Sequence, residues 1–178
     1  MAVQNWTIDT GHSTVAFWVR HLMVSKVHGA FTKWIGSVEL DEEDPTRSRA
    51  EVQIDVASID TKEAQRDAHL RSPDFFDAEK HPRITFKSTS IERADDGHFH
   101  VTGELTIRGV TRSVTLDVED GGRAKHPMTG DMRAGFSAQT SIKRADFGLT
   151  WHAVLEAGGL AVSDKVEIYA EIQASRSA

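Results

Sequence analysis

The sequence predicts an all-β protein, an eight-stranded antiparallel barrel with one short α-helix over one end. Two observations carry this prediction. Roughly eight segments alternate apolar and polar residues, with turn or loop sequences between them at hairpin spacing. One segment, about 62–71, instead combines good helix formers with no β-branched residue. Closing such a sheet into a barrel removes the edge strands that otherwise promote aggregation.

Three strand segments precede the predicted helix. In 14–20, Val15, Phe17 and Val19 share one face, and in 51–59 a similar apolar row alternates with polar residues. Between them, 27–40 is a single long run. Its glycines at 29 and 36 predict a bulge or a sharp bend, as barrels require. The acidic segment 41–49 contains Pro45 and is predicted to be a loop.

The helix has recognisable start and stop signals. Asp60 or Thr61 can cap its first turn, and Glu63 lies three residues after Asp60, as in a capping box. Pro73 ends it, because the residue before a proline disfavours helical backbone.

Strand patterns then return. They begin with Ile84 and Phe86 after Pro82 and recur in 99–107, 110–118, 134–142 and 166–172, whereas 144–163 is irregular. The predicted inner face carries small residues, namely Gly103, Ala134, Ala138 and Ala170. Small inward residues leave space for a cavity, but they also pair with large ones in a filled core, so the pattern is compatible with either interior.

Length and composition narrow the possible functions. The 178 residues suit one domain, spanning 1–178, that can bury a full core. The absence of cysteine excludes disulfides, thiolate nucleophiles and Cys-ligated metals. A net charge of −6 without a basic stripe argues against nucleic acid as a partner. We see no secretory leader and no apolar run near the ~18 residues of a membrane span, and therefore expect a cytoplasmic protein without a transmembrane segment.

Several segments, taken in order, resemble the YceI-like family. They are 6–9, His12-Ser13, 15–17, 66–70, 74–77, 82–86, 103–111 and 144–148. Each motif alone is weak, but their order and spacing make the resemblance specific, and it spans nearly the whole chain. The resemblance implies a lipocalin-like barrel that binds a long amphiphile, such as a polyisoprenoid, an isoprenoid quinone or a fatty-acid derivative. It also implies a homodimer, and it carries no catalytic residues with it.

A long hydrocarbon chain requires an apolar tunnel, because binding is driven by about 25 cal/mol per Å² of apolar surface removed from water. Candidate lining residues are Val15, Phe17, Val19, Ile54, Ile84, Phe86, Leu105, Phe136 and Ile142, with Phe147 and Trp151 closing one mouth. These side chains would equally serve as plain core.

A polar head group requires a few donors at the mouth. Arg66 and His69 lie one turn apart near the helix end, and Arg108 and Arg144 lie at strand ends. The planar fork of arginine suits phosphate or carbonyl groups. The same charges could instead fix the helix to the barrel, and Asp67 could pair with Arg71 across one turn.

Two alternatives remain. His98, His100 and Glu104 share one face of a strand in a spacing similar to a cupin metal motif, which suggests a metal-dependent enzyme. Because the opposite face is apolar, we expect these three side chains to face solvent, whereas a cupin site faces inward. The other alternative is a stress-related structural module with a filled barrel. We favour lipid binding or carriage without catalysis, without a cofactor other than the bound amphiphile, and without a metal.

Overall fold

A computed structural model describes residues 3–151 and 162–176. Its strands form one antiparallel sheet that closes on itself, because β1 pairs with β4 on one side and with β11 on the other. The strands are β1 Gln4–Ile8, β2 Thr14–His21, β3 Ser25–Phe31, β4 Trp34–Leu40, β5 Arg49–Asp55, β6 Ile59–Asp60, β7 Arg83–Asp95, β8 His98–Ile107, β9 Val110–Lys125, β10 Met132–Lys143 and β11 Lys165–Arg176.

The barrel has eight strand positions, although the sheet contains more strands than that. Residues 174–175 of β11 pair with β1, and residues 167–171 pair with β2. The 3-10 turn η1, Thr10–His12, separates β1 from β2, so the two occupy one barrel position in succession. The predicted eight-stranded antiparallel barrel is therefore confirmed.

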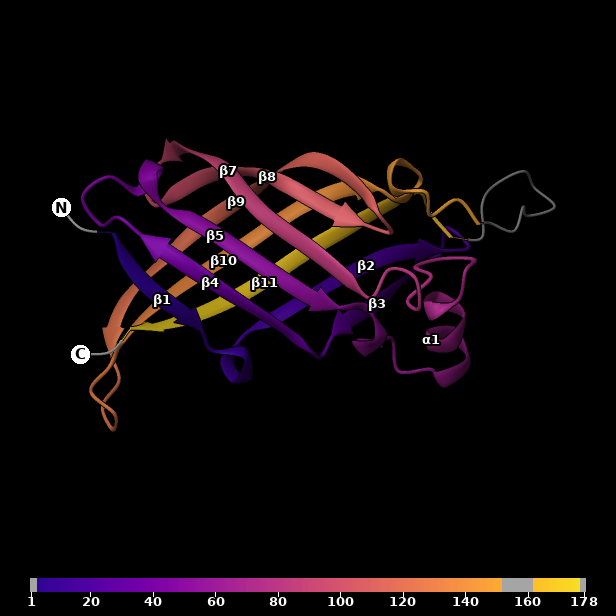
Figure 1. Cartoon of the computed structure of the whole chain (residues 1–178), viewed down its shortest axis with the longest axis horizontal. Helices are drawn as coiled ribbons and strands as arrows, with labels where there is room; N and C mark the ends of the chain where they lie inside the picture. Colours follow the sequence, from indigo (N-terminus) through magenta and orange to yellow (C-terminus); the bar gives the residue numbers. More distant parts are fainter. Residues whose placement is uncertain (1–2, 152–161, 177–178) are drawn as a thin grey trace.

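Helix α1, Ala64–Arg71, lies at one end of the barrel, and the two chain termini lie at the other (Figure 1). The helix begins two residues later than predicted. Lys62 adopts a left-handed backbone (φ 68°), and the Glu63 carboxylate caps the helix by accepting from the N–H groups of Gln65 and Arg66. Asp60 caps the N–H of Lys62 instead. The first turn is thus capped by the predicted capping-box glutamate itself, one residue before the helix.

The glycines at 29 and 36 have a different role from the one predicted. A Cβ on Gly29 would lie 2.4 Å from the Phe17 ring, and one on Gly36 would lie 2.7 Å from the Ile8 side chain. Both glycines therefore allow a close approach of side chains rather than forming a bulge. The register shifts occur between 88 and 90, 93 and 95, and 135 and 136. The run 27–40 also divides into β3 and β4 at 32–33.

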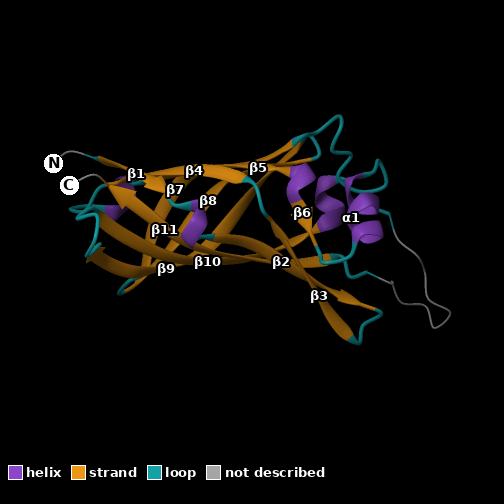
Figure 2. Ribbon diagram, turned by 90° about the horizontal axis from the view of Figure 1, so that it is seen from below, coloured by secondary structure: helices purple, strands orange, loops and turns teal. Residues whose placement is uncertain are grey.

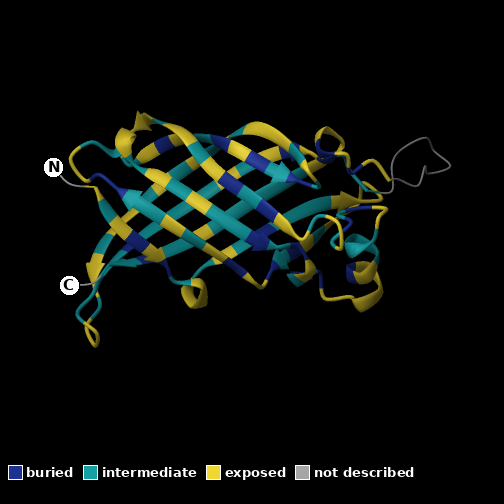
Figure 3. Ribbon diagram, viewed as in Figure 1, coloured by how far each residue is buried: buried dark blue, intermediate teal, exposed yellow. Residues whose placement is uncertain are grey.

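Burial alternates along the strands, as expected for a sheet with one inner face (Figure 3). The α1 end of the barrel is largely filled by large buried side chains from the strand ends, the short helical turns and the loops, and a cleft between β9 and β10 reaches two of them, Ile142 and Phe147. The side chains that fill this end are Phe31, Trp34, Val56, Ile59, Phe75, Ile84, Ile107, Ile142, Phe147 and Leu149. We call this set the end plug. No described helix is long and apolar enough to cross a bilayer.

Candidate ligand cavity

A cavity of about 240 Å³ lies inside the barrel, on the terminal side of the end plug. Its wall is built mainly from the inward-facing apolar rows of β4, β5 and β7–β11. The apolar lining residues are Ile8, Val15, Val38, Leu40, Ala50, Val52, Ile54, Phe86, Ile91, Phe99, Val101, Leu105, Val114, Leu116, Val118, Phe136, Ala138, Ile168, Ala170 and Ile172. Such a wall favours a hydrocarbon over a polar molecule.

The small residues of the inner face do not all create space. Ala138 and Ala170 line the cavity, as a hollow interior requires. Gly103 instead accommodates the Phe86 ring, because a Cβ there would lie 2.4 Å from the ring edge. Ala134 is buried against Trp6 and Leu40. The barrel is hollow in its terminal part and filled at its α1 end, which does not fit the filled-barrel alternative.

The charged part of the lining lies at the terminal end of the barrel. We call the charged lining residues Asp41, Glu42, Arg49, Asp120 and Arg123 the rim. The 41–48 loop, between β4 and β5, supplies the first two, and β9 supplies the last two. The rim gives an otherwise apolar cavity a polar opening.

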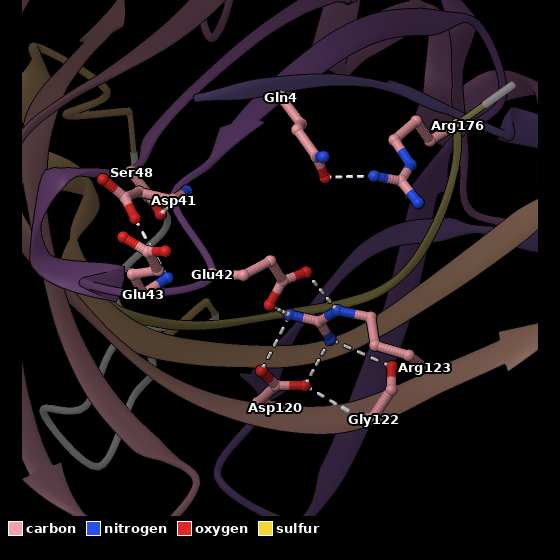
Figure 4. Close-up of polar contacts among 9 residues, drawn as sticks. All are labelled: Gln4, Asp41, Glu42, Glu43, Ser48, Asp120, Gly122, Arg123 and Arg176. Atoms are coloured by element: carbon pink, nitrogen blue, oxygen red, sulfur yellow. Dashed lines mark hydrogen bonds and ion pairs between the residues drawn. The ribbon is translucent and has the colours of Figure 1, made fainter. Parts of the chain in front are cut away.

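Arg123 connects the two sides of the rim (Figure 4). Its Nε and Nη2 donate to the two carboxylate oxygens of Glu42 at 2.8 and 3.2 Å. Its Nη1 and Nη2 donate to those of Asp120 at 2.8 and 3.2 Å, and Nη1 also donates to the Gly122 carbonyl at 3.0 Å. These bonds use all five N–H groups of a guanidinium. Burial alone would lower the pKa of Arg123, but the two carboxylates outweigh it and raise the pKa above its ordinary value.

The aromatic ring of Trp6 packs near the guanidinium group of Arg123 in the rim. Trp6 is 2% exposed and lies near two guanidinium groups, with the Arg123 Cζ 5.9 Å and the Arg176 Cζ 5.2 Å from its ring centroid. Arg176 in turn donates to the Gln4 amide oxygen (Figure 4).

Asp41, which is 3% exposed, accepts from the N–H groups of Glu43 and Asp44 and thereby shapes the 41–48 loop.

Five of the predicted lining residues are in the cavity wall, namely Val15, Ile54, Phe86, Leu105 and Phe136. The other six lie elsewhere. Ile84, Ile142 and Phe147 belong to the end plug, and Phe17 packs on Phe31 with ring centroids 5.8 Å apart. Val19 pairs with Val27 in the β2–β3 hairpin, and Trp151 is 37% exposed beside His69 and Phe75.

The four basic residues predicted to hold a head group surround the α1 end, where each bonds to the protein. Arg66 donates to the Thr61 hydroxyl at 2.7 Å, and His69 contacts Asp74 at 2.8 Å. Arg108 donates to the Phe75 carbonyl, and Arg144 donates to four backbone carbonyls. Their contact with a ligand stays a prediction. Asp67 bonds to Thr61 rather than pairing with Arg71 as expected.

Sequence reasoning missed the rim. The sequence predicts a loop at 41–49 and a strand pattern only over 110–118, whereas β9 extends to Lys125 and carries Asp120 and Arg123 toward the cavity. The order of the predicted strands could have located the rim, because every second hairpin loop of an antiparallel barrel lies at the same end. The β4–β5 and β9–β10 loops and both termini were therefore predictable neighbours.

The residues of the cupin alternative lie on the outside of the barrel. His98, His100 and Glu104 are exposed, and His100 contacts Asp117 at 3.2 Å. Across residues 3–151 and 162–176, no group of three or more His, Asp or Glu side chains is placed to hold a metal ion. The inward-facing ligand set of a cupin is therefore not formed by these residues.

A closed antiparallel barrel with an apolar interior cavity defines a lipocalin-like barrel protein. The YceI-like domain model matches residues 6–174, and the chain belongs to the YceI-like family. A UPF0312 protein of Staphylococcus aureus strain MSSA476 is 38% identical over 173 residues, which cover 97% of this chain and 98% of that protein.

Solved structures of related proteins have the same fold. BcnA of Burkholderia cenocepacia is 27% identical with a TM-score of 0.82, covering 93% of this chain and 98% of that one. The YceI protein of Campylobacter jejuni is 34% identical with a TM-score of 0.77, covering 89% and 90%. A polyisoprenoid-binding domain from Saccharophagus degradans is 16% identical with a TM-score of 0.67, covering 96% and 97%, a likeness that shows the fold alone.

Proposed function

We propose that this protein binds and carries a long-chain amphiphile, such as a polyisoprenoid, an isoprenoid quinone or a fatty-acid derivative, with the chain in the barrel cavity and without catalysis. The observation that carries the proposal is the apolar cavity itself, which opens at a polar rim. Membership of the YceI-like family supports it, as does the polyisoprenoid-binding domain among the proteins of the same fold.

The size of the cavity bears on how a chain would enter. Its 240 Å³ lie just below the ~300–1,000 Å³ typical of small-molecule sites. A chain as long as a polyisoprenoid therefore requires lining side chains to move outward. Several wall residues, including Val114, Leu116, Val118 and Ile168, are only partly buried and are not locked in the solid part of the core. Movement at these positions costs less than movement within the end plug.

We place the head group of the ligand at the rim rather than at the α1 end. The rim residues line the cavity, whereas Arg66, His69, Arg108 and Arg144 do not. Those four side chains bond to the chain around α1 and suit a structural role. A homodimer, which the family resemblance implies, remains part of this proposal.

The most direct experiment is solvent extraction of the purified protein followed by mass spectrometry. We expect a copurified amphiphile with a long apolar chain. We also expect the stripped protein to bind a fluorescent long-chain lipid that a polyisoprenoid alcohol displaces. If nothing is extracted and the stripped protein binds neither probe, the proposed function is wrong.

A pair of variants then tests the cavity as the site. Ala138→Phe places a ring in the cavity wall, whereas Ala124→Phe makes the same change on the exposed outer face of β9. We expect Ala138→Phe to reduce the amount of bound lipid at least tenfold, with Ala124→Phe close to wild type. Circular dichroism and thermal unfolding check that both variants fold. Equal binding by the two folded variants would place the ligand elsewhere.

A further inference from the structure

The β2–β3 hairpin extends beyond the wall of the barrel near the α1 end (Figure 2). β2 pairs with β11 only over 14–18, and β3 meets β6 only at Ala30 and Phe31. Residues 19–27 therefore form a two-stranded ribbon that pairs mainly with itself. Its base also contacts residues 162–163, through two hydrogen bonds between Arg20 and Ser163 and a bridge between His21 and Val162. A ribbon in this position contributes little to the core, so its sequence is free to serve contacts outside the molecule.

The tip of the hairpin has an unusual composition. Residues 22–24 form the loop between the paired residues His21 and Ser25. Leu22 and Met23 are the central residues of its turn, with φ values of 50° and 61°, and the Val24 N–H donates to the His21 carbonyl at 3.1 Å. Such turns favour Asn-Gly, because positive φ is costly for residues with a bulky side chain. Asn-Gly would therefore fit this turn with less backbone strain than Leu22-Met23. Backbone strain that persists in a structure often marks a functional position.

The tip also holds three consecutive exposed apolar side chains. Leu22, Met23 and Val24 are 42%, 62% and 79% exposed. Among the described residues, the other large exposed hydrophobic side chains are isolated, at Val3, Ile35, Met128 and Trp151. Three consecutive exposed apolar side chains at the end of a protruding ribbon suit insertion into an apolar medium.

The ribbon behind the tip is basic and carries a tryptophan. Arg20 and Lys26 face each other across the two strands, and both approach the Trp18 ring, at 5.7 and 4.3 Å from its centroid. Between Asp9 and Glu39 the sequence has no acidic residue, although the whole chain carries a net charge of −6. The neighbouring carboxylate on β11, Glu167, is held by Lys165 and Ser141.

We propose that this hairpin docks the protein on an anionic lipid bilayer. The apolar tip enters the boundary between head groups and acyl chains, and Arg20, Lys26 and Trp18 lie at the level of the head groups. Interfacial anchors combine these residue types in this order of depth. A second copy of this protein is a poorer partner for the hairpin than a bilayer is. A two-fold pairing of the hairpins would bring Arg20 and Lys26 of both chains together, and these positive charges would repel one another.

The test is cosedimentation of the full chain with vesicles of phosphatidylglycerol and phosphatidylcholine, compared with vesicles of phosphatidylcholine alone. The tip variant is Leu22→Asn with Met23→Gly, which supplies the residues that the turn prefers. We therefore expect it to unfold at a higher temperature and yet bind the anionic vesicles at least tenfold more weakly. The control is Met128→Ser, an exposed methionine on the β9–β10 loop at the other end of the barrel, which should bind as wild type.

The charge variants are Arg20→Gln and Lys26→Gln, with Arg112→Gln and Lys125→Gln on β9 as controls. Each charge removed from the hairpin should weaken binding about fivefold, and added salt should reduce the difference. If the tip variant and its Met128→Ser control bind the anionic vesicles equally, the proposal is wrong. It is also wrong if wild type ignores anionic vesicles, or if the tip variant only converts a dimer into a monomer in light scattering. All these vesicle assays use protein from which any bound lipid has been extracted. Their outcome therefore tests the hairpin separately from the proposed binding of a lipid in the cavity.

Discussion

At the scale of single residues, Arg144 shows how backbone carbonyls can hold a buried positive charge, with the Asp164 carboxylate as a further favourable charge. Its side chain is 5% exposed and donates to the carbonyls of Leu149, Trp151, Val162 and Ser163 at 2.6–3.3 Å. It thereby joins the segments 149–151 and 162–163, which the sequence separates. Burial lowers the pKa of Arg144. The residue was a head-group candidate by composition, and its contacts suit a structural tie.

We expect Arg144→Lys to lower the free energy of unfolding by at least about 2 kcal/mol, because a single ammonium cannot reach carbonyls on both segments and those left behind are unsatisfied. Urea unfolding measures the effect. Arg112→Lys, at an exposed position of β9, is the control and should change the free energy by no more than about 0.5 kcal/mol. Equal effects of the two substitutions would show that Arg144 does not hold these segments together.

At the scale of elements, Asp9 joins the first barrel position to β10. It follows β1, caps η1 through the Gly11 N–H, and its second oxygen contacts His12 Nδ1 at 2.9 Å and Arg133 Nη1 at 2.7 Å. The hydrogen bond with His12, followed by that with Arg133, lowers the pKa of Asp9. A carboxyl group whose pKa is lower in the folded state stabilises folding above its unfolded pKa, and that contribution is lost as the pH falls through the folded value.

Asp9→Asn keeps an oxygen acceptor at the cap but removes the charge. We expect it to reduce the free energy of unfolding by about 0.5–1 kcal/mol at neutral pH. The difference from wild type should begin to shrink as the pH falls to the unfolded pKa of about 3.9, and it should disappear only below the lower pKa of the folded state. Urea titrations at several pH values test this, with Asp95→Asn in β7 as an exposed control. A constant difference across the pH range would contradict the role of the charge.

Local patterns predicted the elements better than they predicted the site. Alternation located most of the strands because each has one inward face, but it missed β1 and joined β3 to β4. The proline at 73 placed the end of α1 within two residues. Composition could not show which face of Gly103 meets the Phe86 ring, or that Ile84 and Ile142 fill one end while Ala138 and Ala170 leave the other hollow. Those outcomes depend on which strand ends converge, and only the three-dimensional register fixes that.

At the scale of the whole molecule, the barrel has two unlike ends. One end is filled by aromatic and aliphatic side chains, and the other carries the charged rim. Figure 1 shows α1 at the first end and the chain termini at the second. This polarity assigns a direction to the proposed ligand, with its chain toward the end plug and its head at the rim. It also separates the proposed membrane contact, near α1, from the opening of the cavity.

The charges of the rim suggest which head groups the opening accepts. Asp41, Glu42 and Asp120 are acidic, whereas Arg49 and Arg123 are basic, and all donors of Arg123 are already used within the protein. An anionic head would therefore meet a net negative rim without a free Arg123 donor. An uncharged carbonyl or hydroxyl head would avoid that repulsion.

Replacing Glu42 by Gln should shift this preference, because it removes one negative charge and frees Arg123 donors. We expect Glu42→Gln to strengthen binding of a long-chain fatty acid about two- to fivefold, the range of a partly exposed ion pair, and to leave binding of the matching fatty alcohol nearly unchanged. Glu119→Gln removes the same charge from the outer face of β9, next to Asp120, and serves as the control. Competition against a fluorescent lipid measures the affinities of the fatty acid and of the fatty alcohol. If Glu42→Gln and Glu119→Gln give the same ratio of acid to alcohol affinity, the head group does not lie at Arg123, and the basic residues around α1 become the better candidates.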